Sequence, residues 1–276
     1  MNDQQMELYL REDFREMWKG VNPFDEVFQL TGTVYRNLDG RRTLRFEKGG
    51  RGFFLKLHTG VGWPEIFKNL VQMKRPILGA ENEWRAIHRL NAIGVDTMNL
   101  AAYGSKGRNP ARRVSFVITD ELNGMRSLEE VTAAWKEHPP PVELKRFFAE
   151  RIASMSQKLH SNGMNHRDYY ICHFLTNATA ESWAAEPVRV VLIDLHRVEL
   201  RRQTPVRWVC KDLGALCFSA MDIGLTKRDL LRFMRDYSGK SLRRTLREDG
   251  RFWEAVRRRA VELYRKVNGR VPGLLA

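Results

Sequence analysis

In the first third of the chain, apolar and polar positions alternate over short runs that are separated by turn residues. This alternation is typical of β-strands. The runs are residues 32–36, 43–47 and 52–57, and the turns between them are residues 37–40 and 48–50. Three runs joined by such short turns predict an antiparallel meander. A further strand is expected at residues 114–118, where five residues in a row have strand character.

Elsewhere the apolar positions recur with the period of a helix. This period predicts helices near residues 64–73 and 80–93 and, after a linker at 119–124, near 144–159, 230–237 and 252–264. Only residues 188–193 interrupt the later helices with a short apolar strand. We therefore predict an α+β fold of two lobes with a cleft between them: a sheet-rich N-terminal lobe, residues 1–121, and a helical C-terminal lobe, residues 122–276.

Composition narrows the class of protein. The chain has 276 residues, 43% of them hydrophobic, which is enough to build a sizeable core. No apolar run is long enough to predict a membrane span, and the first residues lack the apolar segment of a secretory signal. The three cysteines, Cys172, Cys210 and Cys217, have no CxxC spacing. A reducing, cytoplasmic compartment is the simplest interpretation.

Charge points to an anionic partner without identifying it. The formal net charge is +14, and residues 240–270 hold eleven Lys or Arg against four Asp or Glu. Such a surface attracts phosphates, anionic lipid or an acidic protein, although a solvated helix face explains the same pattern. A non-catalytic basic binding module is one hypothesis for this chain. Because no nucleic-acid-binding motif is present, we expect no nucleic acid partner.

The run His166-Arg167-Asp168 carries the strongest chemical pattern. It follows the long helix predicted at 144–159 and a glycine stop, and it resembles the H-R-D-x-x-x-x-N catalytic loop of protein kinases. In that loop the Asp accepts the proton of the substrate hydroxyl, so Asp168 is the candidate base, with Arg167 orienting the loop. The position of the motif's Asn is His173, a weaker candidate metal ligand because Mg²⁺ prefers oxygen. The plain alternative is that Asp168 is a loop carboxylate in a salt bridge.

Asp194 ends the apolar strand predicted at 188–193, as the metal-binding Asp of the kinase D-F-G element does. We therefore predict that it holds Mg²⁺ against nucleotide phosphates. The alternative is an Asp at the end of a strand whose side chain only hydrogen-bonds within its own turn.

Lys56 lies within the apolar strand at 52–57 and needs a partner if it is buried. Glu83 lies on the apolar side of the helix at 80–93, whereas Glu81 points away from it. This pair resembles the strand Lys and helix Glu of kinases, where the Lys contacts the nucleotide phosphates. A surface lysine on an edge strand is the alternative.

Two weaker predictions complete the nucleotide site. The first hairpin turn, with Gly40, Arg41 and Arg42, occupies the place of the kinase glycine-rich loop but has one glycine only. It can meet phosphate or be an ordinary turn. Glu121 lies in the expected hinge, where backbone groups can bind adenine. Each pattern alone is weak, but they follow one another in the order found in kinases.

The sequence is also similar to the lipopolysaccharide core heptose(I) kinase family. The matching stretches are GRRTLRF, FFLKLHTGVGWPEIFKNL, AENEWRAIHRLNAIGVDT, NHRDYYICHFL and VLIDLHR. The resemblance implies a protein-kinase-like fold and phosphorylation, with ATP and Mg²⁺, of the first inner-core heptose of lipopolysaccharide. It also implies the lipopolysaccharide core oligosaccharide as partner, work at the cytoplasmic face of the inner membrane as a peripheral protein, and association with acyl carrier protein. Another lipopolysaccharide sugar or a protein tyrosine remains an alternative acceptor.

Overall fold

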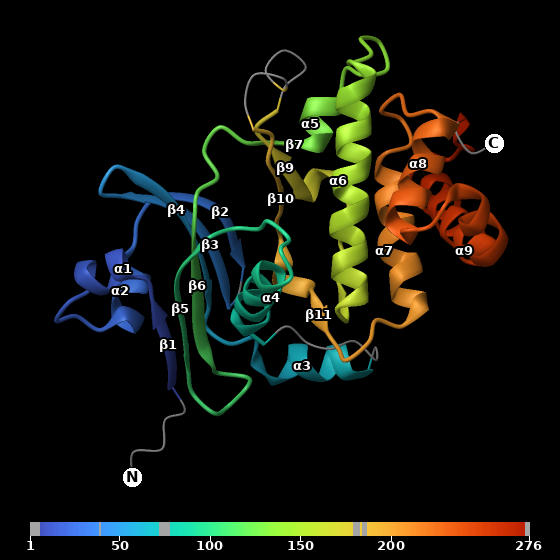
Figure 1. Ribbon diagram of the computed structural model, residues 1–276. Helices are drawn as coiled ribbons and strands as arrows, with labels where there is room; N and C mark the ends of the chain where they lie inside the picture. Colours follow the sequence, from blue (N-terminus) through green and yellow to red (C-terminus); the bar gives the residue numbers. More distant parts are fainter. Residues whose placement is uncertain (1–5, 39, 72–77, 179–182, 184–186, 274–276) are drawn as a thin grey trace. The chain divides into compact units, whose positions relative to one another are not determined.

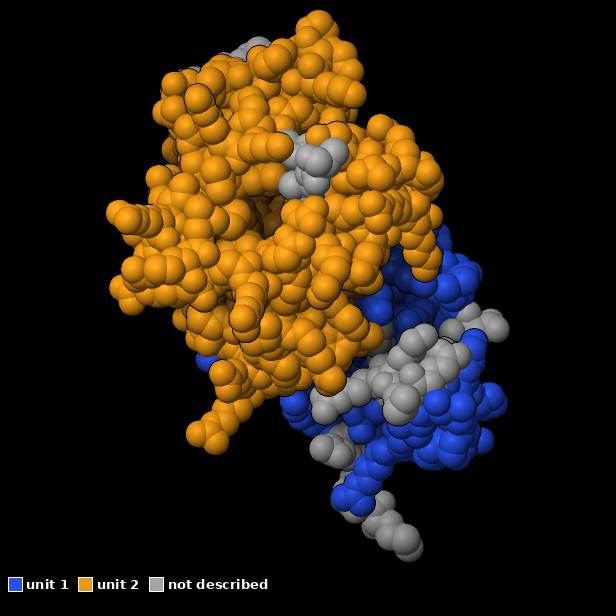
Figure 2. All heavy atoms as spheres, turned by 90° about the vertical axis from the view of Figure 1, so that its right-hand side faces the viewer, with its two compact units in different colours: residues 1–89, 98–123, 195–197 blue, residues 90–97, 124–194, 198–276 orange. Residues whose placement is uncertain are grey.

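Two compact units make up the chain (Figure 2). Residues 1–89, 98–123 and 195–197 form the first, and residues 90–97, 124–194 and 198–276 form the second. The structure is a computed structural model that describes residues 6–38, 40–71, 78–178, 183 and 187–273. Among these residues, no helix is long and apolar enough to cross a membrane.

The first unit is built on a six-stranded antiparallel sheet, with strand order β1-β5-β6-β4-β3-β2 (Figure 1). The strands are β1 (Met6–Leu10), β2 (Thr33–Leu38), β3 (Arg41–Lys48), β4 (Arg51–His58), β5 (Leu100–Lys106) and β6 (Val114–Asp120). Strands β2, β3 and β4 pair in succession, which confirms the predicted meander. Of the predicted first turn, Asp39 lies outside the described residues.

The core of this unit follows from the alternation along the strands. On β4, Phe53, Leu55 and Leu57 are buried, while Phe54 and Lys56 on the opposite face are half-buried. Two short helices, α1 (Glu12–Met17) and α2 (Pro23–Gln29), cover the apolar face and add Phe14 and Phe24 to its core. Phe14 meets Phe53 edge to face, with ring centroids 5.1 Å apart.

Helix α3 (Gly62–Val71) and helix α4 (Glu81–Ala92) follow β4. They confirm the helices predicted near 64–73 and 80–93, except that residues 72 and 73 lie outside the described part of the chain. On α4, Ala86, Ile87 and Leu90 are buried. Trp84 stacks on Tyr103 of β5 with ring centroids 4.5 Å apart. Helix α4 is thus anchored by its apolar stripe.

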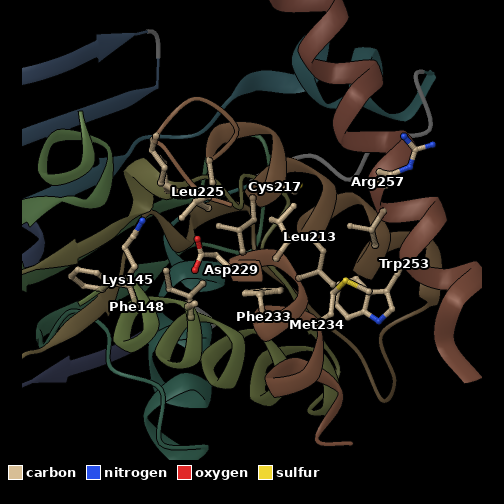
Figure 3. A pocket seen from close by; sticks show the side chains of 18 of the residues that line it. Lys145, Phe148, Leu213, Cys217, Leu225, Asp229, Phe233, Met234, Trp253 and Arg257 are labelled. Carbon is tan, nitrogen blue, oxygen red and sulfur yellow. The ribbon is translucent and has the colours of Figure 1, made fainter. Parts of the chain in front are cut away.

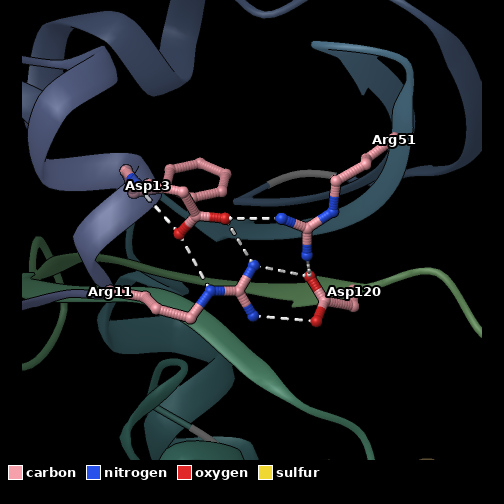
Figure 4. A network of polar contacts seen from close by, with 5 residues as sticks. Arg11, Asp13, Arg51 and Asp120 are labelled. Atoms are coloured by element: carbon pink, nitrogen blue, oxygen red, sulfur yellow. Dashed lines mark hydrogen bonds and ion pairs between the residues drawn. The ribbon is translucent and has the colours of Figure 1, made fainter.

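A network of charges closes the end of β6 (Figure 4). The guanidinium of Arg11 donates to both oxygens of Asp13 and of Asp120, each at 2.8 Å. Arg51 donates to the same two carboxylates at 2.9 and 3.1 Å. Two cations and two anions therefore tie the segment between β1 and α1 to the strand that leads into the predicted hinge.

The second unit is mainly helical and contains two small sheets. Its elements are β7 (Arg126–Ser127), α5 (Leu128–Thr132), α6 (Val142–Ser161), β8 (Met164–Asn165), the 3-10 helix η1 (Ile171–His173), β9 (Phe174–Thr176), β10 (Val190–Leu192), β11 (Glu199–Leu200), α7 (Val206–Ser219), α8 (Lys227–Ser238) and α9 (Leu242–Asn268). The short helix η2 (Leu195–Arg197) belongs to the first unit. The predicted later helices are confirmed as α6, α8 and α9, and the predicted strand at 188–193 is the shorter β10.

Helix α6 is the centre of this unit. Its buried side chains include Leu144, Phe148, Ile152, Met155 and Leu159, which recur at the three- and four-residue spacing of one helix face. The helix ends before Gly163, whose backbone φ of 77° suits glycine. A Cβ at Gly163 would also lie within van der Waals overlap of the Arg201 carbonyl oxygen. The chain can therefore turn here directly into β8 and the run His166-Arg167-Asp168.

Candidate active site

Lys56 and Glu83 form an ion pair in the first unit, as predicted. Lys56 Nζ donates to Glu83 Oε1 at 2.8 Å. The Glu83 side chain is 2% exposed and the Lys56 side chain 24% exposed. A buried carboxylate is stable only when it is paired, and the exposed part of the lysine remains accessible to a ligand. Phosphate contact by Lys56 remains a prediction.

The hairpin turn between β2 and β3 is packed against the chain that follows β4. The carbonyl oxygen of Gly40 accepts from Thr59 N at 3.0 Å. With φ at 75° and the Gly60 carbonyl where its Cβ would lie, position 40 requires glycine. Arg42 donates to the Leu30 carbonyl at 3.2 Å. These contacts fix Gly40 and Arg42, and contact of Gly40, Arg41 or Arg42 with phosphate remains a prediction.

Glu121, in the predicted hinge, is held by its side chain and by its backbone. Its carboxylate accepts from Arg45 Nε at 2.6 Å and from Arg45 Nη2 at 2.8 Å. Its N–H donates to the Gly52 carbonyl at 2.9 Å. The carboxylate is therefore committed to Arg45 and serves to fix the backbone, which is the part that the prediction assigns to adenine.

In the second unit, the run His166-Arg167-Asp168 is held by a buried carboxylate that the sequence interpretation missed. Asp212, on α7 and 1% exposed, accepts from the backbone N–H of His166 at 2.6 Å and of Arg167 at 2.9 Å. Arg167 has a φ of 75°, a conformation that non-glycine residues rarely adopt and that neighbouring contacts must enforce. Asp212 supplies two such contacts. A single Asp within the apolar run of α7 was the available signal.

The same loop is tied to the strand that carries Asp194. His166 Nε2 donates to the Ile193 carbonyl at 2.9 Å, and Ile193 N–H donates to the His173 carbonyl at 2.9 Å. Burial lowers the pKa of His166, so its imidazole is neutral and has one proton to donate. Asp194 has a φ of 60°, the second positive value at a non-glycine position among the described residues.

Three of the predicted site residues, Asp168, His173 and Asp194, are brought together here. His173 Nδ1 donates to the backbone oxygen of Asp168 at 2.6 Å, and its Nε2 lies 3.6 Å from Asp194 Oδ2. Burial lowers the pKa of His173, but the hydrogen bonds with Cys172 and the Asp168 carbonyl outweigh it and raise the pKa to about 9. The imidazole is therefore cationic at neutral pH in this structure and lies between the other two residues.

The donor set fits a magnesium ion that substrate phosphates help to hold. Mg²⁺ keeps several waters and binds through one or two carboxylates together with phosphate. No group of three or more metal-ligating side chains occurs among the described residues. Asp194 offers one half-exposed carboxylate. His173 can offer only Nε2, and only after losing its proton, so Asp194 is the better predicted ligand.

Arg167, predicted to orient the loop, contacts β11 and α7. Its Nη1 donates to Glu199 Oε1 at 3.4 Å, and its Cζ lies 5.9 Å from the centre of the Trp208 ring. These contacts hold the loop at Arg167. The structure thus brings Arg167 together with α7 and β11, which the sequence did not predict.

An antiparallel sheet with a Lys–Glu pair, a helical unit with an H-R-D loop, and a strand-end Asp beside that loop together define a protein-kinase-like phosphotransferase. Known proteins with similar sequences belong to the same class. A sequence model of the lipopolysaccharide kinase (Kdo/WaaP) family matches residues 25–237. This chain therefore belongs to the lipopolysaccharide kinase (Kdo/WaaP) family, which confirms the resemblance recognised in the sequence.

Individual relatives are similar over almost the whole chain. The lipopolysaccharide core heptose(I) kinase WaaP of Pseudomonas aeruginosa is 50% identical over 261 residues, which cover 95% of this chain and 97% of the relative. The enzyme of the same name from Escherichia coli is 48% identical and covers 87% of this chain and 90% of its own length. A solved structure of WaaP in complex with acyl carrier protein is 45% identical, with a TM-score of 0.80, and covers 94% of this chain and 99% of the solved one. The predicted α+β, protein-kinase-like fold class is thereby confirmed.

Proposed function

We propose that this protein transfers the γ-phosphate of ATP to a hydroxyl of the first inner-core heptose of lipopolysaccharide. The observation that carries the proposal is the loop of Asp168, held by Asp212 on one side and by His173 beside Asp194 on the other. The choice of acceptor is supported by relatives of about 50% sequence identity that are named as heptose(I) kinases.

In this mechanism Asp168 is the general base. Its carboxylate takes the proton of the heptose hydroxyl as the hydroxyl oxygen attacks the γ-phosphorus. The bond from the γ-phosphorus to the β,γ-bridging oxygen breaks, and ADP leaves with that electron pair. His173 holds the backbone of Asp168, and Asp212 holds the two residues before it. A base fixed in this way needs little reorganisation during transfer.

The nucleotide is assigned mainly to the first unit. Lys56, fixed by Glu83, would contact the α- and β-phosphates, and the turn with Gly40, Arg41 and Arg42 would cover them. Because the N–H of Glu121 is bonded to Gly52, its carbonyl is the group left for adenine. This assignment keeps residues 1–121 as the nucleotide lobe and residues 122–276 as the lobe with the catalytic loop.

Asp194 would hold Mg²⁺, with His173 as the second candidate ligand. When bound, the metal would offset the negative charge that develops on the phosphates during transfer. No other step is assigned to it.

Transfer of labelled phosphate from ATP to purified lipopolysaccharide cores tests this function. A core that ends at the first heptose should be labelled, whereas a core without heptose should not. Labelling of the heptose-free core would move the acceptor to another lipopolysaccharide sugar. Labelling of tyrosine on added protein, with none on the core, would identify a protein kinase. No transfer to any of these acceptors would contradict the proposed function.

We further propose an acylated acyl carrier protein as partner, because α5 to α9 enclose an apolar cavity of about 350 Å³ (Figure 3). Phe148, Leu213, Phe233 and Trp253 are among its lining residues. A similar solved chain was captured with acyl carrier protein, which bears acyl chains of matching apolar character. The basic segment at residues 240–270 complements an acidic carrier.

Comparing the affinity for acylated and for acyl-free carrier protein shows whether the carrier binds through the cavity or through the surface alone. The acylated form should bind more tightly in size-exclusion or calorimetric titration. Ala149→Trp, which fills the cavity, should remove that difference, while Ala134→Trp at an exposed position should keep it. Equal affinity of both forms for the wild type would contradict the assignment.

We also propose that α3 places the protein on the cytoplasmic surface of the inner membrane. Four apolar side chains share one exposed face of this helix: Trp63 at 48%, Phe67 at 58%, Leu70 at 55% and Val71 at 83% exposure. Trp63 and Phe67 pack together with ring centroids 5.9 Å apart. An exposed aromatic face of this kind suits the interfacial region of a bilayer.

Basic residues lie near the start of this helix. Gly62, the first residue of α3, donates its N–H to the Ala111 carbonyl at 3.1 Å, which places the helix next to the segment Arg108, Arg112 and Arg113. Trp63→Ser with Phe67→Ser should reduce cosedimentation with vesicles containing phosphatidylglycerol. Phe28→Ser, at an equally exposed aromatic of α2, is the matched control. Unchanged binding of the double variant would contradict this membrane face.

A further inference from the structure

Four basic side chains surround one indole at the start of α7, beside the catalytic loop. Lys211 Nζ lies 4.2 Å from the centre of the Trp208 ring. The guanidinium carbons of Arg201 and Arg207 lie 5.5 Å from it, and that of Arg167 lies 5.9 Å from it. We call these five residues the Trp208 cluster. They come from the catalytic loop, from the residue after β11 and from the start of α7.

Two of the four cations in the cluster pair with a carboxylate. Glu199 pairs with Arg167 at 3.4 Å and with Arg201. Within the described part of the chain, neither Arg207 nor Lys211 has a salt-bridge partner. Cation–π contact offsets part of the repulsion between these charges. A bound anion would offset much more of it.

Two solvated arginines of α9 are arranged differently. On α9, Arg244 pairs with Glu248 at 2.9 Å and Arg257 with Glu254 at 2.8 Å, each through a neighbour on the same helix face. Instead, Arg207 and Lys211 are exposed and the cluster gathers its cations at one point.

The cluster is attached to the catalytic loop by two links. Arg167 belongs to it and immediately precedes Asp168. Lys211 is followed by Asp212, whose carboxylate holds the N–H groups of His166 and Arg167 at 2.6 and 2.9 Å. A group bound at the cluster is therefore fixed relative to the base by one helix and one loop of the same unit.

We infer that the Trp208 cluster binds an acidic group of the acceptor, a carboxylate or phosphate of the lipopolysaccharide core near the heptose that is phosphorylated. The inference rests on the proposed function for the identity of the acceptor. The forked guanidinium of Arg207 suits both anions, and Lys211 adds a point charge. Lys56 and Asp194 are the residues assigned to ATP and its metal, so the cluster serves the other substrate.

Calorimetric titration of delipidated core oligosaccharide into the full chain, without ATP, tests this inference independently of catalysis. Lys211→Gln and Arg207→Gln should each raise the Kd of the oligosaccharide roughly tenfold, as expected for one charge-assisted contact. Lys211→Arg, which keeps the charge, should stay near the wild-type Kd. Arg243→Gln, which removes an exposed charge of α9, should leave the Kd unchanged. The Kd for Mg-ATP should be the same in all four variants.

Two modified oligosaccharides identify the anion. If carboxylates are recognised, methyl esterification should abolish the difference between wild type and Lys211→Gln; if phosphates are recognised, dephosphorylation should abolish it. Equal Kd values for wild type, Lys211→Gln and Arg207→Gln would overturn the inference. Undetectable binding of millimolar oligosaccharide to the wild type would also overturn the inference. The inference would be overturned as well if the variants weakened only the binding to anionic vesicles. Phosphate transfer to the intact core is scored separately, so the proposed function can stand when this inference fails.

Discussion

His173 Nδ1 lies 2.6 Å from the backbone oxygen of Asp168, five residues earlier in the chain. The catalytic loop of protein kinases has an Asn at this position. Here the imidazole donates a hydrogen bond to the loop and lies beside the carboxylate of Asp194 as well. The departure from the motif therefore preserves a contact within the loop.

His173→Asn should keep that contact because an amide also donates. We expect kcat within roughly threefold of wild type for this variant and a loss of more than about tenfold for His173→Ala, the effect of one hydrogen bond to a catalytic loop. Steady-state rates at saturating ATP and acceptor measure both. Equal losses in the two variants would mean that the hydrogen bond is not what position 173 contributes.

Lys56→Met should raise the KM for ATP and lower kcat by roughly a hundredfold or more, since it removes a phosphate-facing cation. It should also destabilise the chain by about 1–3 kcal/mol, because Glu83 would be left buried without its partner. Denaturant unfolding and initial rates separate the two effects. Lys48→Met, at an exposed position of β3, is the control.

The double variant Lys56→Met with Glu83→Gln sharpens this test. The neutral amide removes the unpaired charge, so part of the stability should return while activity stays low. If activity returned together with stability, Lys56 would have a structural role alone.

Asp212→Asn should lower kcat by roughly ten- to a hundredfold while leaving the Kd for ATP unchanged. The amide can accept from one of the two backbone N–H groups but places its own donors near the other, which loosens the loop. Asp222→Asn, which weakens a contact with the Tyr264 hydroxyl, is a matched control and should keep the wild-type kcat. An unchanged kcat in Asp212→Asn would show that the loop does not depend on this carboxylate.

Stability should fall in mild acid because of His58. Burial lowers the pKa of its imidazole to about 3, with the charges of Arg41 and Lys56 acting in the same direction. The unfolded state takes up the proton near pH 6.5, so stability is retained above that pH and is lost as the pH falls toward 3. From pH 7.5 to 5 the loss from this group is about 2 kcal/mol. Urea unfolding of wild type and His58→Gln across this range should show a shallower slope for the variant; identical slopes would contradict this origin.

Much of the fold follows from local patterns that act within a few residues. The alternation on β4 and the helical period on α6 were readable because each element buries one face. Strands β5 and β1 were not predicted. Six of the seven residues of β5 are buried, which removes the alternation, and β1 is a short and largely exposed edge strand. Neither element has a local pattern that identifies it without its neighbours.

Site residues could be predicted where a charged residue occupies an apolar position of its own strand or helix. Lys56 in an apolar strand and Glu83 on an apolar helix face are such residues, and the two form the predicted pair. The contacts of Asp212 with the loop, and the grouping of Arg167 with Trp208, join segments some 40 residues apart in the sequence. Such contacts depend on tertiary packing, so residue types and local spacing could not reveal them.

The central claim is that Asp168 removes the proton from the acceptor hydroxyl. The most direct measurement is single-turnover transfer of labelled phosphate from ATP to a heptose-terminated core by wild type and Asp168→Asn at equal occupancy of both substrates. The rate should be lower by about 10²–10⁴-fold in the variant, with unchanged Kd values for Mg-ATP and core. Transfer by Asp168→Asn at the wild-type rate would contradict it.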